Sequence, residues 1–289
     1  MEPREFCVDE YTDYLVYSGL AERESDPRLK EILERLAQME KKHYEFWLRY
    51  SPESEGKYRR SYLLLSKLMR RLLGLTFTLK FLERHEEEVI SGYRRYLGKV
   101  DSNDVEKLKE IIRDEEEHEK ALMSEVHERI VDYLGSITLG LSDALIELVG
   151  VLAGTVAVFR STFIAGITGL IVGVSASISM AAAAYLQAKN EHKSSPRLSA
   201  IFTGISYVLT VILLILPFFL LDMPLQSLIA SILIAVAIVV STSYYTAIIF
   251  DRKFLTTFLE TAALTLGIGF GVYLFGETIR MITGISVML

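Results

Sequence analysis

The chain has 289 residues, a formal net charge of −6 at pH 7 and one cysteine, Cys7. The length allows two domains, and a single cysteine excludes both an internal disulfide and a cysteine-based zinc site. Acidic residues outnumber basic ones by 30 to 24 in residues 1–135, whereas residues 136–289 hold 7 of each. The acidic surplus argues against nucleic acid as a partner, because nucleic-acid-binding proteins present a basic face. The fall in charge density predicts two domains, residues 1–132 and 133–289.

The sequence of the first domain is typical of helices separated by short loops, which predicts an all-α fold. Apolar residues recur at helical spacing, and Asp26 followed by proline is typical of a helix N-cap. Gly74 is expected to bend the third helical region. The expected helices cover about 3–24, 27–50 and 57–97, and a fourth begins near Asp104.

Glutamate and histidine recur in a repeated order along this domain. Tyr17 follows Glu10 by seven residues, Tyr93 follows Glu86 by seven, and a Glu-x-x-His pair comes about 30 residues after each of these glutamates. Four carboxylates and two imidazoles from four helices are the ligands of a dinuclear site for divalent metals. A solvated helix face is the alternative for any single glutamate, but the matched repeat favours the metal site. Its predicted ligands are Glu10, Glu40, His43, Glu86, Glu115 and His118.

With these motifs, residues 1–130 resemble the rubrerythrin branch of the ferritin-like family. The resemblance implies a ferritin-like four-helix bundle that holds a dinuclear iron site and reacts with oxygen or peroxide, which would give the domain ferroxidase activity. Manganese or zinc would be alternatives to iron. Tyr17 and Tyr93 would lie beside the ligands and assist catalysis from outside the coordination sphere. The sequence lacks the four cysteines of a rubredoxin-like module, which argues against electron transfer of that kind.

Residues 57–80 carry seven basic residues and no acidic ones. Leucines such as Leu65, Leu68 and Leu72 recur between them at helical spacing. One interpretation is a crossover between the second and third helices of the bundle. The other is an amphipathic helix that lies on a surface of anionic lipid. The two interpretations are compatible, because the domain would sit directly on a membrane.

Five apolar runs follow, each long enough to cross a bilayer core of about 30 Å. Basic residues favour one set of connecting loops by five to two, so the positive-inside rule places the N-terminus in the cytoplasm and the C-terminus outside. The acidic N-terminus is not typical of a signal peptide. We therefore expect an integral, multi-pass cell-membrane protein. Its spans are expected at about 134–159, 162–187, 198–221, 225–250 and 254–276. Glycine pairs typical of close helix packing occur at Gly150/Gly154, Gly169/Gly173 and Gly267/Gly271.

Charged residues inside apolar spans are costly, so they are candidates for function. Asp143 and Glu147 lie one turn apart in the first span, and Glu260 lies near the cytoplasmic start of the fifth. If the first two spans are antiparallel neighbours, Asp143 and Met180 lie at one depth, roughly 13 Å inside the membrane. A carboxylate opposite a thioether suits transient binding of Fe²⁺, whereas packing for Met180 and a buried hydrogen bond for the acids are the alternatives. The expected transport path comprises Asp143, Glu147, Met180 and Glu260.

Residues 133–289 resemble the vacuolar iron transporter family through three segments. The segments are Leu141-Ser-Asp-Ala-Leu-Ile-Glu147, Gly150-Val-Leu-Ala-Gly154 and Ser179-Met-Ala-Ala182. The resemblance implies five spans, a homodimer and exchange of Fe²⁺ for protons, with Asp143 and Met180 in the pore. Ala183-Ala184 departs from the family's usual Gly-Glu, and the glutamate-rich helices that plant members insert between spans two and three are absent. The whole chain is similar to membrane-bound ferritins of the erythrin–vacuolar iron transport type.

The combined expectation is a proton-coupled Fe²⁺ exporter whose cytoplasmic di-iron domain captures, senses or oxidises iron. One alternative is a membrane-anchored ferroxidase or peroxidase, although an anchor has no need of acids in its spans. A second is a manganese or broad divalent-metal exporter, since oxygen and nitrogen ligands do not separate Mn²⁺ from Fe²⁺. A third is a domain that binds metal only to gate the spans. The expected partners are Fe²⁺, protons, membrane lipid and a second copy of the chain.

Overall fold

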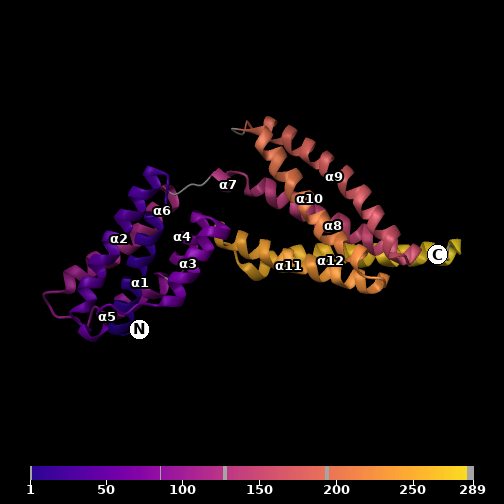
Figure 1. Cartoon of the computed structure of the whole chain (residues 1–289). Helices are drawn as coiled ribbons and strands as arrows, with labels where there is room; N and C mark the ends of the chain where they lie inside the picture. The colour runs from indigo at the N-terminus through magenta and orange to yellow at the C-terminus, as the bar shows by residue number, and fades with distance from the viewer. Residues whose placement is uncertain (1, 85, 126–128, 193–194, 285–289) are drawn as a thin grey trace. The chain divides into compact units, whose positions relative to one another are not determined.

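The structure is a computed structural model that describes residues 2–84, 86–125, 129–192 and 195–284. At residues 83, 86–88, 117–125 and 129–130 it describes the backbone alone. All regular structure in the described part of the chain is helical (Figure 1). The chain divides into two compact units, residues 1–128 and 129–289. The boundary lies four residues before the one at 132/133 that charge density predicts.

Unit 1 contains six α-helices and one 3-10 turn in its described residues. Helix α1 packs along α2, and α3 packs against α1 and α4. Helices α5 and α6 pack against each other, and α6 also contacts α2 and α4. The elements are α1 (Pro3–Ala21), α2 (Pro27–Leu48), η1 (Pro52–Ser54), α3 (Arg60–Leu73), α4 (Leu75–Glu83), α5 (Glu86–Tyr96) and α6 (Val105–Glu125).

Local sequence explains where these helices begin and end. The Asp26 carboxylate accepts hydrogen bonds from the backbone N–H groups of Arg28 at 2.9 Å and Leu29 at 3.5 Å, which confirms the predicted N-cap of α2. Gly74 has a φ of 92°, which glycine adopts readily, so the predicted bend is a full break between α3 and α4. Helix α4 ends at Glu83 and α5 begins at Glu86, whereas the sequence analysis expected one helical region over 57–97.

Two apolar clusters form the interior of unit 1. The first takes residues from α1, α2 and α4, among them Val16, Leu33 and Leu79. The second takes residues from α1, α2, α5 and α6, among them Trp47 and Leu108. Each cluster buries side chains that would otherwise contact water, which stabilises the fold by about 25 cal/mol per Å² of apolar surface.

Polar residues lie between these two clusters along the helices that the clusters share. On α1, Glu10 lies between Phe6 of the second cluster and Val16 of the first. On α2, Glu40 and His43 lie between Ala37 of the first cluster and Tyr44 of the second. Unit 1 therefore encloses a buried polar layer within an apolar interior.

Unit 2 begins with the short helix α7 (Arg129–Asp132) and continues with five long helices. Each of the five is long and apolar enough to cross a membrane, which confirms the prediction of five candidate spans and is consistent with a multi-pass membrane protein. The last of them continues past the expected end at residue 276. The helices are α8 (Leu134–Phe159), α9 (Thr162–Asn190), α10 (Pro196–Leu220), α11 (Pro224–Ile249) and α12 (Phe254–Thr283).

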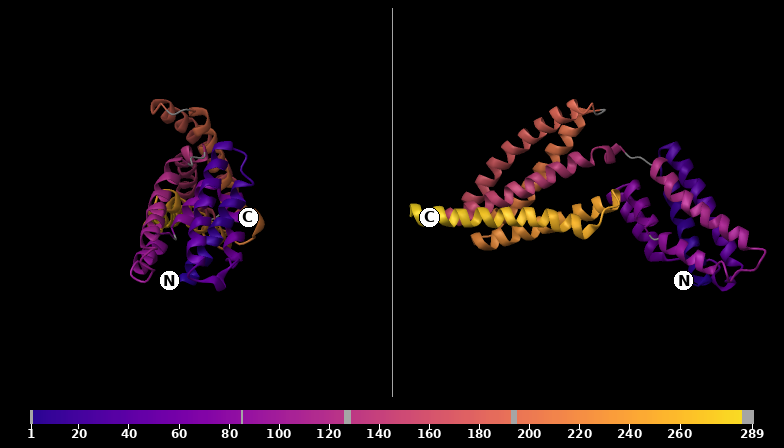
Figure 2. Two further views of the ribbon diagram at one scale, coloured as in Figure 1. Left: turned by 90° about the vertical axis from the view of Figure 1, so that its left-hand side faces the viewer. Right: turned by 180° about the vertical axis from the view of Figure 1, so that it is seen from behind.

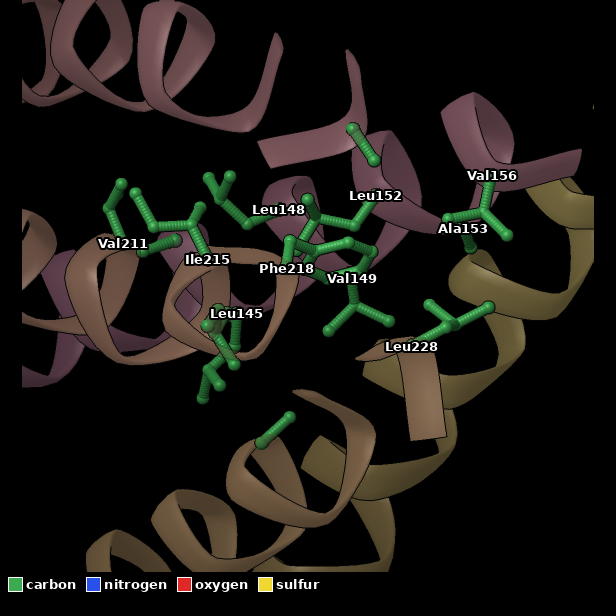
Figure 3. Close-up of a cluster of buried hydrophobic side chains, with 14 of the residues drawn as sticks. Leu145, Leu148, Val149, Leu152, Ala153, Val156, Val211, Ile215, Phe218 and Leu228 are labelled. Carbon is green, nitrogen blue, oxygen red and sulfur yellow. The ribbon is translucent and has the colours of Figure 1, made fainter. Parts of the chain in front are cut away.

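Helix α8 lies at the centre of unit 2, since it packs against α9, α10, α11 and α12 (Figure 2). Its side chains Leu145, Leu148 and Leu152 meet Ile215 and Phe218 of α10 in one apolar cluster (Figure 3). The burial of the spans agrees with this central position. Half of the most apolar segment of α8 is buried within the chain, whereas α9 and α12 leave most of theirs exposed. Such exposed apolar surface is suited to lipid.

Glycines allow α8 to approach α12 closely. A Cβ added at Gly276 would lie 2.8 Å from the carbonyl oxygen of Gly154, and one added at Gly269 would lie 2.6 Å from Val149 Cγ1. The predicted pair Gly267/Gly271 has no neighbour within 4 Å of such a Cβ in the described chain. The expectation that this pair packs the spans together is therefore wrong within one chain, because the glycines that face α8 are Gly269 and Gly276.

Candidate metal centre and span carboxylates

Three helices of unit 1 bring four of the predicted metal ligands together. Glu10 comes from α1, Glu40 and His43 come from α2, and Glu115 comes from α6. Because Glu40 and His43 are three residues apart, both point from the same face of α2. One ligand atom from each of the four residues lies within 4.8 Å of the other three, and all four side chains are buried.

The imidazole of His43 is the centre of this group. Its Nδ1 atom lies 2.9 Å from Glu115 Oε1, 3.4 Å from Glu10 Oε2 and 3.7 Å from Glu40 Oε2. On the other side of the ring, Nε2 lies 3.9 Å from Asp114 Oδ2. A single ring nitrogen therefore faces three carboxylates, more than one N–H proton can satisfy.

Burial sets the proton affinity of the cluster. It raises the pKa of Glu10 to about 7 and that of Glu40 to about 8, and it raises the pKa of Glu115 as well. The neighbouring His43 opposes these shifts in part. Burial lowers the pKa of His43, but the adjacent carboxylates of Glu115, Asp114 and Glu10 outweigh it and leave this pKa well above its ordinary value.

The donor set fits a divalent metal ion. Glu10 Oε2 and both ring nitrogens of His43 are buried, and although carboxylate oxygens lie close to them, none of these contacts has hydrogen-bond geometry in the described part of the chain. Leaving buried polar atoms unpaired costs roughly 1–3 kcal/mol each. A divalent cation would bind the carboxylate oxygens and one ring nitrogen of His43 and would neutralise the carboxylates, since hard oxygen and imidazole ligands suit Fe²⁺, Mn²⁺ or Zn²⁺.

The remaining predicted residues of unit 1 are placed less completely. Glu86 is the first residue of α5 and His118 lies on α6, but both side chains fall outside the described residues. Tyr17 is buried in the apolar cluster of α1, α2 and α4. Tyr93 stacks on Trp47 with ring centroids 5.0 Å apart, and its hydroxyl is buried without a described hydrogen-bond partner.

The repeat did not predict two further acids near the cluster. Burial raises the pKa of Asp13 well above its ordinary value, and the charges of Glu40 and Glu115 add to this, so Asp13 lies in the same electrostatic environment. Asp114 approaches the far side of the His43 ring. The spacing Glu10-x-x-Asp13 equals the Glu-x-x-His spacing and is the signal in the sequence that points to Asp13.

Unit 2 brings two of the predicted span residues into a polar contact. Asp143 and Glu147 are partly buried on α8, one turn apart. The hydroxyl of Tyr207, a fully buried residue of α10, donates a short hydrogen bond to Glu147 Oε2 and lies in the electrostatic environment of Asp143. The sequence analysis missed Tyr207, because a tyrosine within an apolar span is usually interpreted as packing.

The other two span residues are placed separately. Met180 of α9 is partly buried and packs against the apolar cluster around α8. Glu260 is exposed on α12. The structure therefore groups Asp143, Glu147 and Tyr207, with Met180 beside the same core.

Comparisons of the chain with protein-family models, with curated proteins and with solved structures find no match. The family resemblances therefore rest on the motifs in the sequence.

Proposed function

We propose that this protein exports Fe²⁺ from the cytoplasm in exchange for protons, and that unit 1 captures the metal on the cytoplasmic side. The single observation that supports this most is the buried cluster of Glu10, Glu40, His43 and Glu115. Burying three carboxylates together is unfavourable without a cation. The same chain carries five candidate spans with acids in the first.

In unit 1, Glu10, Glu40, His43 and Glu115 would hold one metal ion. With Glu86 and His118 added, the proposal extends to a dinuclear iron centre in a ferritin-like bundle. Bound iron would supply redox chemistry with oxygen or peroxide. The residues of the chain would hold protons that the metal displaces, since Glu10 and Glu40 keep theirs to near neutral pH and must release them when metal binds.

In unit 2, Asp143 and Glu147 would bind Fe²⁺ in transit. Asp143 would exchange a proton for the metal, because a carboxyl group binds a cation in its deprotonated form, so metal entry would release a proton and metal departure would take it back. Tyr207 would orient Glu147 through its hydrogen bond. Met180 would add a soft ligand that favours Fe²⁺ over Mg²⁺ or Ca²⁺.

Metal flux into liposomes that contain the full chain tests this function. We expect uptake of Fe²⁺ that grows with an imposed pH gradient and is small when the gradient is removed. Comparison with Mn²⁺ and Zn²⁺ separates an iron exporter from a broad divalent-metal exporter. Absence of flux for all three metals, with iron-dependent oxygen consumption intact, would favour the membrane-anchored ferroxidase.

The two units are proposed to have separable roles. Replacement of His43 and His118 by alanine should abolish iron-dependent oxygen consumption while leaving measurable flux through the spans. Loss of all flux in a variant that is still folded in the membrane would favour the gating function instead.

A further inference from the structure

Helix α3 presents an apolar stripe that no described part of unit 1 covers. Leu64, Leu68 and Leu72 are 58%, 53% and 68% exposed, and Leu65 beside them is 41% exposed. These residues recur every four positions, so at about 100° per residue they fall within one narrow face. The opposite face carries Ser66 and Met69, which are buried. An apolar face exposed on an otherwise polar unit indicates an interaction surface.

Basic side chains follow one edge of this stripe. Arg60, Lys67 and Arg71 are spaced seven and four residues apart and lie within about 60° of Leu64 around the helix. None of the three forms an ion pair with the residues that the structure describes. By contrast, Arg59 binds Asp9 at 2.8 Å and Arg70 binds Glu24 at 2.7 Å, so those two cations hold the fold together.

We propose that α3 lies on the surface of an anionic lipid bilayer, with its leucines among the acyl chains and its three cations at the headgroups. An apolar face with arginine and lysine along its edge is the pattern of a helix in the plane of a membrane. The three cations would add to the binding, because anionic headgroups attract basic residues that lie beside a bilayer. This inference does not depend on iron export.

The connection between unit 1 and the first candidate span is short enough to keep unit 1 near a bilayer. Eight residues separate Glu125, the last residue of α6, from Leu134, the first residue of the first candidate span. A fully extended chain covers at most about 3.5 Å per residue, so the connection spans no more than roughly 30 Å. A short tether raises the effective concentration of the bilayer around unit 1, which favours docking by a helix of modest affinity.

Two other occupants fit less well. A second copy packed antiparallel on this helix about a two-fold axis would bring Arg60, Lys67 and Arg71 against the same three cations. Nucleic acid would accept the cations but leave four leucines against a polar polymer, and the chain as a whole is acidic. Lipid is the one surface that satisfies both the apolar stripe and its charged edge.

Spin labelling of the full chain in vesicles tests the proposal. Cys7 is fully buried and burial raises its pKa to about 11, so it stays unreactive while a label is placed at Leu68→Cys. The matched control is a label at Glu34→Cys, an exposed position on α2. In vesicles of phosphatidylcholine with phosphatidylglycerol, the label at position 68 should be accessible to oxygen and shielded from a water-soluble nickel chelate, whereas the label at 34 should show the reverse.

Charge variants then identify the source of the attraction. Neutralising Arg60, Lys67 and Arg71 to glutamine should lower the docking equilibrium by on the order of a hundredfold in anionic vesicles, at about fivefold for each cation. Neutralising Arg28, Lys30 and Arg35 on α2 changes the net charge equally and should leave docking unchanged. A label at 68 as open to the nickel chelate as the label at 34 would overturn the proposal. Shielding from both reagents would also overturn it, because a protein surface and not lipid would then cover α3.

Discussion

Replacing Glu40 by glutamine separates the cost of the buried carboxylates from their use as metal ligands. Glutamine has the size of a protonated glutamic acid, but it cannot ionise and is a poor ligand for a divalent cation. Glu40 is 3% exposed in the wild-type protein, and burial raises its pKa from 4.5 to about 8. We therefore expect the variant to be more stable than the wild type without metal and less stable with it.

The size of the effect follows from proton linkage. A carboxyl group whose pKa is raised on folding keeps its proton in the folded state after the unfolded chain has lost it. Stability then falls as pH rises through the window between about 4.5 and about 8. Relative to a pH below 4.5, the raised pKa of Glu40 alone lowers the free energy of unfolding by about 3 kcal/mol at pH 7 and by about 5 kcal/mol at pH 9. His43, whose pKa is also raised, adds stability at low pH that is likewise lost as pH rises.

Trp47 provides the assay, because it is the one tryptophan of the chain, is fully buried, and lies in the apolar cluster beside the cluster of ligands. Its fluorescence during denaturation of the full chain in detergent reports unit 1 alone. With a chelator at pH 8, Glu40→Gln should unfold at higher denaturant than the wild type, and with Fe²⁺ or Mn²⁺ the order should reverse. Glu34→Gln, at an exposed position on the same helix, should behave as the wild type in both conditions. A variant less stable than wild type in chelator would refute the reasoning.

Three further outcomes are expected. Gly276→Ala should destabilise the full chain in detergent by about 1–3 kcal/mol, because its Cβ would meet the Gly154 carbonyl oxygen at 2.8 Å, whereas Gly271→Ala should change stability by less than about 0.5 kcal/mol; thermal unfolding compares the two. Tyr207→Phe keeps the buried ring but removes the donor to Glu147, so Fe²⁺ flux into liposomes should fall by roughly tenfold or more, and wild-type flux would deny Tyr207 a role. Met180→Ala should weaken Fe²⁺ flux and its preference over Mg²⁺ without eliminating flux, as a competition assay would show.

The features that the sequence predicted well are governed by local rules. The five spans depend on long runs of apolar residues, and the N-cap at Asp26 and the break at Gly74 depend on backbone chemistry within a few residues. The grouping of Glu10, Glu40 and His43 was also predictable, because i,i+3 spacing and a repeated motif place these side chains on facing stripes.

The features that it missed depend on contacts between distant segments. Tyr207 is 60 residues from Glu147, and nothing near it in the sequence distinguishes it from a packing residue. The glycines that face α8 are Gly269 and Gly276, since the rotation of α12 about its axis is set by its neighbours and not by the glycine spacing alone. Asp13 follows Glu10 at the spacing of the Glu-x-x-His pairs, but only the fold shows that α1 brings its charge close to Glu40 and Glu115.

Simultaneous measurement of Fe²⁺ uptake and lumenal pH tests the proposed function most directly. Liposomes that contain the full chain and a pH-sensitive dye would be given Fe²⁺ under an outward proton gradient. We predict that wild-type protein couples Fe²⁺ entry to proton exit. Asp143→Asn, which keeps the size of the side chain but removes its charge and its exchangeable proton, should eliminate both signals. Wild-type Fe²⁺ uptake and proton exit in a folded Asp143→Asn protein would contradict the account and leave Asp143 with a structural role.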